Sequence, residues 1–268
     1  MKMLFFTVTN DLSYDQRMIR ICSSLSAAGF GVRLIGRRLS NSRPLSDQPF
    51  LQTRLRCFFI RGPLFYAEYN IRLFFYLLFN KHDCVCAIDL DTILACYLSS
   101  RFKNTKRVYD AHELFCEMQE IVERPMIYKV WKRIEKMTVP RFSRGYTVNK
   151  PIADEFFRMY GVKYEVISNM AVLRPLQIPA KADKYILYQG AVNAGRSFDT
   201  LIPAMQFVDA RLIVCGEGNY MGNAQRLVKE LNLENKIIFT GNRSPDDLRS
   251  YTLNAWVGIT LFEMKGKS

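Results

Sequence analysis

The hydrophobic and polar positions of this chain alternate between short apolar runs and longer amphipathic stretches. A short apolar run between turn residues is typical of a buried strand, and an amphipathic stretch is typical of a helix covering a sheet. In the first part of the chain, strands are predicted at 3–9, 31–36, 54–60, 84–88, 107–109, 145–148 and 165–168. Helices are predicted between them at 13–28, 64–80, 92–100, 113–139 and 152–160. This alternation predicts a mostly parallel sheet covered on both faces.

Residues 169–184 interrupt this rhythm with two prolines and poor periodicity, which predicts a linker. The alternation then restarts, with strands at 185–189, 211–215, 236–240 and 255–261 and helices at 197–207, 220–231 and 245–251. We therefore expect an α/β protein with two tandem Rossmann-like domains, over 1–168 and 185–268. The second holds four strands at most, whereas a doubly wound domain usually needs about five or six, so we expect it to be incomplete.

Composition narrows the class of protein. Hydrophobic residues make up 49% and charged residues 24% of the 268 positions, which excludes disorder as the main state. There is no apolar run long enough for a membrane-spanning helix, and the apolar start of the chain reads as a strand rather than a signal peptide. The seven cysteines show no disulfide-framework spacing, which indicates reduced thiols in the cytoplasm.

The net charge of +13 is concentrated in the first 170 residues, which hold 26 Lys and Arg against 16 Asp and Glu. Such a basic half indicates an anionic partner (nucleic acid, a phosphorylated ligand or an anionic lipid surface) or simply a solvated basic surface. Residues 121–150 combine eight Lys and Arg with apolar positions, a pattern consistent with a helix on a membrane surface. The aromatic helix at 64–80 could lie beside it, although burial against the sheet is the interpretation that we favour.

Polar residues follow the first and fourth predicted strands, at the edge where ligands bind in open α/β sheets. Asn10, Asp11, Asp15 and Arg17 follow the first strand, where turn chemistry and an acidic first helical turn are the alternative roles. No Gly-x-Gly-x-x-Gly fingerprint is present there. After the fourth strand, Asp91 is expected to cap the next helix, and the neighbouring Asp89 can still face the cleft.

His112 follows the fifth predicted strand in the segment Tyr-Asp-Ala-His-Glu, between Asp110 and Glu113. An imidazole near carboxylates can accept a proton or orient charge. We therefore interpret His112 as functional, the alternative being a helix-start histidine satisfied by Asp110.

Three glycine loops follow consecutive strands in the second part of the chain. Small residues let backbone amides approach an anion, and an arginine can clamp phosphate oxygens. The loops contain Gly190 and Arg196; Gly216, Glu217 and Gly218; and Asn242 and Arg243. Their register predicts a nucleotide site.

Metal binding is not expected. Cys84 and Cys86 alternate along a strand, no Cys-x-x-Cys occurs, and His82 and His112 lack helical pair spacing. The chain also has no Gly-x-Ser-x-Gly elbow and no Walker loop.

Taken in order, these segments resemble the GT-B glycosyltransferases of family 4, the glycosyl transferases group 1. The segments that carry the resemblance are Asn10-Asp11 with Asp15-Gln16-Arg17, Ile88–Thr92, Tyr109–Glu113, Tyr188–Gly190 with Gly195-Arg196, Cys215–Gly218 and Phe239–Gly241. The resemblance implies a retaining, metal-independent enzyme that needs no cofactor. Its C-terminal half binds a UDP- or GDP-linked sugar, and its N-terminal half binds the acceptor.

The resemblance also implies roles for individual residues. His112 would be catalytic, lying near the transferred sugar and the acceptor, and Arg196 would take the pyrophosphate. The acceptor side would consist of Asn10, Asp11, Asp15, Arg17, Asp89 and Glu113. The donor side would consist of Gly190, Arg196, Gly216, Glu217, Gly218, Asn242 and Arg243.

The chain departs from the family in three places. Asn10-Asp11 stands where many relatives have a glycine pair. Many relatives also have an Arg and a Lys in the loop after the first C-terminal strand, and Ala191 takes one of these positions, leaving Arg196 alone. The Glu-x7-Glu segment of the family would fall beyond Ser268, so we expect the chain to be truncated by about a hundred residues relative to the family.

The expected function is sugar transfer to a glycan or lipid-linked acceptor in cell-surface polysaccharide synthesis. We expect a cytoplasmic protein that contacts the inner face of the membrane through its basic N-terminal half. The alternatives are a nucleotide-sugar epimerase of the same fold and an inactive fragment. A nucleic-acid-binding protein is a further class, but no recognition-helix motif or stacking platform supports it.

Overall fold

The computed structural model describes residues 1–263 except 14, 41, 43, 171, 172, 174 and 176–183. The chain divides into two compact units, Met1–Ala171 and Val172–Lys265. Most of the predicted linker at 169–184 lies outside the described residues. Each unit is an α/β layer structure, as the alternating sequence pattern predicts, and each is described by itself.

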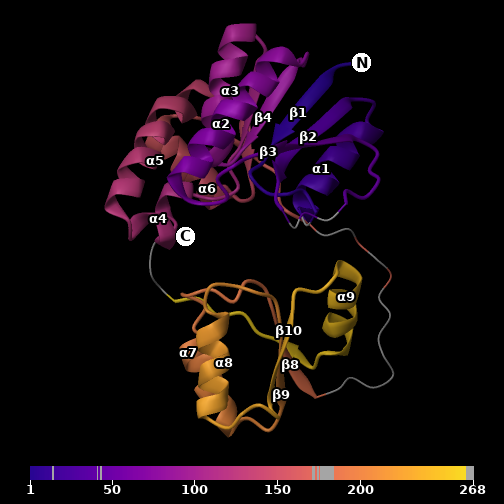
Figure 1. Ribbon diagram of the computed structural model, residues 1–268, viewed down its shortest axis with the longest axis vertical. Helices are drawn as coiled ribbons and strands as arrows, with labels where there is room; N and C mark the ends of the chain where they lie inside the picture. The colour runs from indigo at the N-terminus through magenta and orange to yellow at the C-terminus, as the bar shows by residue number, and fades with distance from the viewer. Residues whose placement is uncertain are drawn as a thin grey trace. The chain divides into compact units, whose positions relative to one another are not determined.

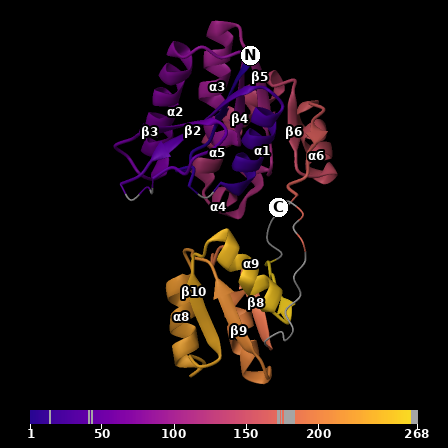
Figure 2. The ribbon, with the colours of Figure 1, turned by 90° about the vertical axis from the view of Figure 1, so that its right-hand side faces the viewer.

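The first unit is built on a seven-stranded parallel sheet in the order β3-β2-β1-β4-β5-β6-β7 (Figures 1 and 2). Its strands are β1 (Met3–Thr7), β2 (Gly31–Arg38), β3 (Leu51–Arg56), β4 (Cys84–Ile88), β5 (Lys106–Asp110), β6 (Gly145–Thr147) and β7 (Glu165–Val166). The order reverses direction at β1, so β1 and β4 are neighbours although a long stretch of chain separates them. Such a reversal is where ligands bind in open α/β sheets.

Helices cover both faces of this sheet. They are α1 (Gln16–Ala27), α2 (Gly62–Phe79), α3 (Leu90–Lys103), α4 (Gln119–Val122), α5 (Pro125–Thr138) and α6 (Lys150–Tyr160). Alternate residues of a strand point to opposite faces. Phe5 therefore joins the core under α2, α3 and α5, while Phe6 joins the core under α1. Figure 1 shows α1 on one side of the sheet and α2, α3 and α5 on the other.

The second unit has a four-stranded parallel sheet in the order β10-β9-β8-β11. Its elements are β8 (Tyr185–Gln189), α7 (Phe198–Ala204), β9 (Arg211–Cys215), α8 (Met221–Glu230), β10 (Ile237–Gly241), α9 (Pro245–Asn254) and β11 (Val257–Gly258). Helices α7 and α8 pack on one face, and α9 packs on the other (Figure 1). The predicted α/β class and the two Rossmann-like sheets are confirmed.

Two sequence expectations about the elements of the first unit are wrong. The third strand ends at Arg56 rather than residue 60, because the Glu68 carboxylate accepts from the amides of Phe58 and Phe59 and holds them in a loop. The predicted helix at 113–139 is divided by short 3₁₀ turns and by a new start at Pro125. A proline at the first helical position favours such a start.

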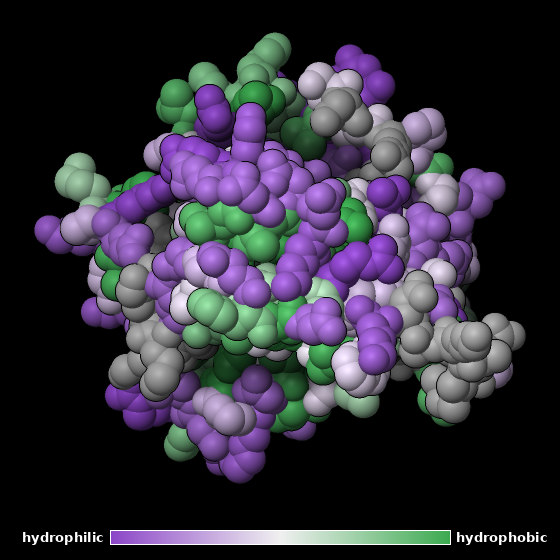
Figure 3. All heavy atoms as spheres, turned by 90° about the horizontal axis from the view of Figure 1, so that it is seen from below, coloured by the Kyte–Doolittle hydropathy of each residue, from purple (hydrophilic) through white to green (hydrophobic). Residues whose placement is uncertain are grey.

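The surface shown in Figure 3 is mainly polar, with smaller apolar patches between the polar side chains. Elsewhere, α5 exposes Met126, Val130 and Met137. Among the described residues, no helix has both the length and the apolar character needed to cross a membrane.

Candidate functional site

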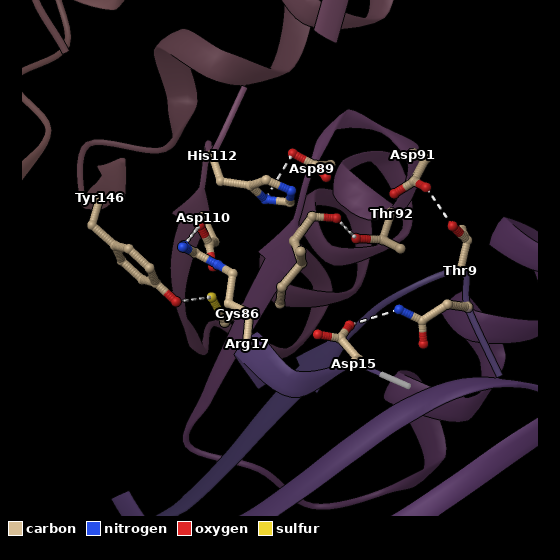
Figure 4. Close-up of polar contacts among 12 residues, drawn as sticks. Thr9, Asp15, Arg17, Cys86, Asp89, Asp91, Thr92, Asp110, His112 and Tyr146 are labelled. Carbon is tan, nitrogen blue, oxygen red and sulfur yellow. Dashed lines mark hydrogen bonds and ion pairs between the residues drawn. The ribbon is translucent and has the colours of Figure 1, made fainter. Parts of the chain in front are cut away.

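The carboxyl ends of β1, β4 and β5 bring together a cluster of polar side chains in the first unit. These three strands are neighbours in the parallel sheet, so the residues that follow them meet at one edge. Figure 4 shows Thr9, Asp89, Asp91, Asp110 and His112 converging there from segments far apart in the sequence. The predicted location of the site at strand ends is therefore matched by a real cluster of side chains.

Arg17 and Asp110 form a buried ion pair at the base of this cluster. The Arg17 guanidinium, on α1, donates to Oδ1 of Asp110 at 2.5 Å, and the Asp110 side chain is fully buried. Burial raises the pKa of the Asp110 carboxyl, and the Arg17 charge opposes that rise. The pair fixes α1 to the end of β5. Asp110 therefore pairs with Arg17 and does not satisfy His112.

His112 faces Asp89 instead. The Nδ1 atom of His112 lies 3.3 Å from Oδ1 of Asp89, without the alignment of a hydrogen bond. Burial, helped by the Arg17 charge, lowers the pKa of His112 to about 4. Burial and the nearby Glu113 and Asp91 raise the pKa of Asp89 well above its ordinary value. His112 is thus a neutral imidazole at pH 7, able both to donate and to accept a hydrogen bond.

The backbone of Asp89 is strained. Asp89 precedes α3 with φ 56° and ψ 176°, a backbone conformation that residues other than glycine rarely adopt. Its amide donates to the carbonyl of Asp110 at 3.0 Å, which ties β4 to β5. Strain of this kind costs about 1–3 kcal/mol and is found most often at functional sites.

Asp91 does not cap α3, contrary to the sequence prediction. The helix begins at Leu90, two residues before its predicted start at Thr92, and the Asp91 carboxylate accepts from the Thr9 hydroxyl at 2.5 Å. Burial raises the pKa of Asp91 to about 7. Asp91 and Thr9 therefore join the polar cluster, and sequence reasoning missed this role.

A set of potential metal ligands lies in the same place. In the described part of the chain, Asp89, His112 and Glu113 each offer one ligand atom, and these atoms lie within 4.8 Å of one another. Spacing along the sequence did not reveal this group because Asp89 and His112 come from different strands. The donor set of two carboxylates and one imidazole could hold a divalent cation.

The polar residues after β1 serve mainly the turn and the start of α1. Asp15 caps α1 by accepting from the Met18 amide, and Asn10 donates to the other Asp15 oxygen at 2.6 Å. The sequence predicted a capping box beginning at Ser13, and this is wrong. Asp11 accepts from the amide and hydroxyl of Ser13, which is turn chemistry.

In the second unit, the glycine loops after β8, β9 and β10 lie side by side. The Gly190 amide donates to the Cys215 carbonyl, and the Gly216 amide donates to the Gly241 carbonyl. A Cβ atom on Gly216 would lie 1.9 Å from the Gly190 carbonyl oxygen, so only glycine permits this approach. Likewise, a Cβ on Gly218 would lie 2.2 Å from the Val192 carbonyl oxygen.

The polar residues of these loops differ in their surroundings. Arg196 lies in the β8–α7 loop, with its Cζ atom 4.1 Å from the centre of the Phe262 ring. Glu217 is exposed next to Gly241, where its Oε1 would be 2.9 Å from an added Cβ. Asn242 and Arg243 are exposed after β10.

Two residues of the first cluster left no local signal in the sequence. Tyr146, from β6, has its ring 5.9 Å from the Arg17 guanidinium and its hydroxyl 4.0 Å from the Cys86 sulfur. The Thr92 hydroxyl, in α3, donates a hydrogen bond to the Ile88 carbonyl and accepts one from the Thr7 hydroxyl. Only the sheet order brings these side chains to the site.

Solved structures resemble this fold closely. Sucrose-phosphate synthase from Thermosynechococcus elongatus superposes with a TM-score of 0.72 at 17% identity, over 98% of this chain and 77% of that one. Anabaena HepE, in complex with UDP and glucose, gives 0.66 at 14% identity, over 96% and 73%. UDP-GlcNAc 2-epimerase from Methanocaldococcus jannaschii gives 0.56 at 13% identity, over 96% and 78%. No curated protein matches the chain by sequence.

These likenesses define the class: the chain has the GT-B fold of two Rossmann-like units. Within that class, residues 174–264 match the model of the family Glycosyl transferases group 1. This match agrees with the family resemblance over that segment, which contains the three glycine loops and Arg196.

Proposed function

We propose that this protein is a glycosyltransferase that moves a sugar from a nucleotide-diphosphate sugar to a glycan or lipid-linked acceptor. The observation that carries the proposal is that residues 174–264, which match the group 1 family, contain the three adjoining glycine loops. The donor is UDP- or GDP-linked and no further cofactor takes part. HepE, solved with UDP and glucose, supports this choice of ligand class.

The second unit would bind the donor. When a sugar leaves a nucleotide diphosphate, negative charge grows on the leaving phosphate, and preorganised donors stabilise it most effectively. Arg196 supplies a permanent cation in the first glycine loop. Gly216 and Gly218 allow the loop backbones to approach closely, which also allows a phosphate to reach the backbone amides.

The first unit would bind the acceptor and present His112 to the transferred sugar. Its low pKa keeps the imidazole neutral, so His112 can accept a hydrogen bond from a hydroxyl without first losing a proton. Asp89 orients the ring from 3.3 Å. Asn10, Asp15 and Arg17 line the same edge, with Glu113 beside His112. We extend the proposal to transfer with retention of anomeric configuration.

The deciding experiment supplies a panel of UDP- and GDP-sugars and measures release of UDP or GDP, with and without glycan and lipid-linked acceptors. We expect acceptor-dependent release that EDTA leaves unchanged and that His112→Ala and Arg196→Ala reduce strongly. Arg226→Ala, on the exposed side of α8, is the matched control. The proposal is overturned if no sugar nucleotide is turned over and Arg196→Ala leaves nucleotide binding unchanged.

A nucleotide-sugar epimerase is the second candidate, favoured by the likeness to the UDP-GlcNAc 2-epimerase fold. An epimerase converts its sugar nucleotide with no acceptor present. Equal turnover with and without acceptor, with the product still attached to the nucleotide, would identify this activity instead.

We also propose that the first unit rests on an anionic membrane surface at the cytoplasmic side, as in the assembly of a cell-surface polysaccharide. The exposed face of α5 supports this contact, because Lys129, Arg133 and Lys136 alternate there with exposed Met126 and Val130. A helix with this pattern can place its apolar side chains among lipid headgroups while its cations meet anionic lipids.

A further inference from the structure

Phe262 covers one face of the Arg196 guanidinium. The Cζ atom of Arg196 lies 4.1 Å from the centre of the ring, which is stacking distance. The Phe262 side chain is nevertheless 63% exposed, so burial in the core does not account for its position. An exposed aromatic ring laid on a cation in a glycine loop calls for another explanation.

The segment that carries Phe262 is held firmly against this loop. The Ile259 amide continues the pairing with β8 by donating to the Leu187 carbonyl, and Leu261 packs on the core under α7 and α8. One residue after Phe262, the Glu263 amide donates to the Gly195 carbonyl at 2.9 Å. The backbone next to Phe262 is thus hydrogen-bonded to the residue directly before Arg196.

The opposite side of the loop is also fixed. The Ala194 amide donates to the Asn219 side chain, and the Asn219 amide donates to the Asn193 side chain, which ties this loop to the one after β9. The backbone of Gly195 has φ 85° and that of Ser197 has φ 50°, so the loop makes a tight turn on either side of Arg196. The backbone is set, and the remaining freedom belongs to the Arg196 side chain.

We propose that Phe262 is a positioning residue that holds Arg196 ready for the diphosphate of the donor. This inference rests on the proposed function. The ring occupies a face of the planar guanidinium, while the N–H groups at its edge stay available for phosphate oxygens. Ordering the long side chain before binding lowers the entropy lost when the ligand arrives. Phe262 itself makes no contact with the reacting atoms.

Stacked cations are common, at roughly one significant pair per 70–80 residues, so the contact alone would decide little. Two features distinguish this pair. Arg196 belongs to a glycine loop that lies within the segment matched by the family model and that packs closely against the next glycine loop. The chain segment that carries the ring is also hydrogen-bonded to that loop, through the Glu263 amide and the Gly195 carbonyl.

The test measures binding of UDP and GDP to the full chain by calorimetry. Phe262→Ala should weaken binding of the nucleoside diphosphate by about two- to five-fold, the range expected for a partly exposed cation–π contact. Phe262→Leu, which keeps apolar bulk without a ring face, should weaken binding as much as Phe262→Ala does. Phe262→Trp, which keeps an aromatic ring, should bind as tightly as the unaltered chain. Phe207→Ala, at a ring that is 89% exposed elsewhere in the same unit, is the control and should change nothing.

A double-mutant cycle separates positioning from general loosening of the structure. If Phe262 acts through Arg196, then Phe262→Ala should have no further effect in an Arg196→Ala background. Its effect should also be smaller for UMP and GMP, which lack the second phosphate. Thermal unfolding of the variants checks that each remains folded.

The outcomes discriminate between the two proposals. If the unaltered chain binds neither UDP nor GDP, the proposed function and this inference both fail. If it binds one of them and Phe262→Ala binds equally well or more tightly, only the positioning role is overturned. Equal losses with and without Arg196 would also overturn it.

Discussion

His112 Nδ1 and Asp89 Oδ1 face each other at 3.3 Å, and neither atom has a hydrogen-bond partner among the described residues. The two side chains come from the ends of neighbouring strands, β5 and β4. Burial shifts the pKa of both groups toward the neutral form, downward for His112 and upward for Asp89. A polar pair left unsatisfied inside a folded unit is suited to receiving a ligand hydroxyl.

His112→Ala should lower the turnover of sugar nucleotide by about a hundred-fold or more, the usual contribution of a positioned proton-transfer group. The affinity for UDP or GDP should remain unchanged, because that ligand is assigned to the second unit. Steady-state kinetics and calorimetry measure the two quantities. Loss of nucleotide affinity with intact turnover would contradict this assignment of roles.

Asp89→Gly should raise the free energy of unfolding of the first unit by about 1 kcal/mol while lowering activity. Glycine relieves the strain at φ 56°, although part of the gain is offset by the greater entropy of glycine in the unfolded chain. Fluorescence of the buried Trp131, in a Trp256→Phe background, reports urea unfolding of this unit.

The matched control for this prediction is Asp89→Ala. It removes the same carboxyl group but keeps a Cβ atom, so the backbone strain remains. If Asp89→Ala gains as much stability as Asp89→Gly, burial of the carboxyl group rather than backbone strain is the source of the effect.

The pH dependence of stability should separate Asp91 from His112. Folding raises the Asp91 pKa from 3.8 to about 7, so between these values the folded state binds more protons, and the Asp91 contribution is lost as pH rises. Folding lowers the His112 pKa from 6.5 to about 4, so the unfolded state binds more protons there, and the His112 contribution is lost as pH falls.

Urea unfolding measured from pH 4 to pH 7 tests both signs. Relative to the unaltered chain, Asp91→Asn should become progressively more stable as pH rises, and His112→Gln should become progressively less stable. Asp154→Asn, exposed on α6, should follow the unaltered chain throughout. Parallel pH curves for all three variants would show that neither buried group titrates as described.

Arg17→Ala should lower the free energy of unfolding by about 3–5 kcal/mol, because it leaves the buried Asp110 carboxylate without its partner. The loss should shrink as pH falls, because protonation of Asp110 removes the unpaired buried charge. Arg158→Ala, which breaks an ion pair whose arginine is 65% exposed, should cost less than about 1 kcal/mol. Similar small losses in both variants would argue against a structural role for the buried pair.

Replacing Lys129, Arg133 and Lys136 by alanine should reduce binding to vesicles containing phosphatidylglycerol by about a hundred-fold, at about 1 kcal/mol for each cation. Cosedimentation measures this loss, and added salt should reproduce it. The control replaces Lys150 and Arg158, two exposed cations on α6. If both sets reduce binding equally, net charge rather than the α5 face drives the contact.

The strands could largely be predicted from the sequence because each is a short apolar run with its own turn signals. Strand β4 was expected at 84–88 and β8 at 185–189, and both have those bounds. The end of β3 could not be predicted, because the apolar residues after Arg56 look like a continuing strand. Their loop depends on Glu68, a carboxylate in the following helix.

The candidate site was predictable in location but not in its pairings. The motif around His112 indicated a site at the end of β5, whereas its Asp89 partner and the Arg17–Asp110 pair depend on sheet order. Asp91 illustrates the limit well. Its sequence position suits a helix cap, and only the start of α3 at Leu90 and the approach of Thr9 give it another role.

The central position of β1 has a consequence for synthesis of the chain. Its Leu4 pairs in register with Val32 of β2 and with Cys84 of β4, so one edge of β1 waits for a partner that is synthesised 80 residues later. At about 5–20 residues per second, that wait lasts about 4–16 s. During this time Phe5, which becomes almost fully buried in the core under α2, α3 and α5, lacks the partners that those helices supply. Burial of Phe5 therefore depends on contacts that are distant in the sequence.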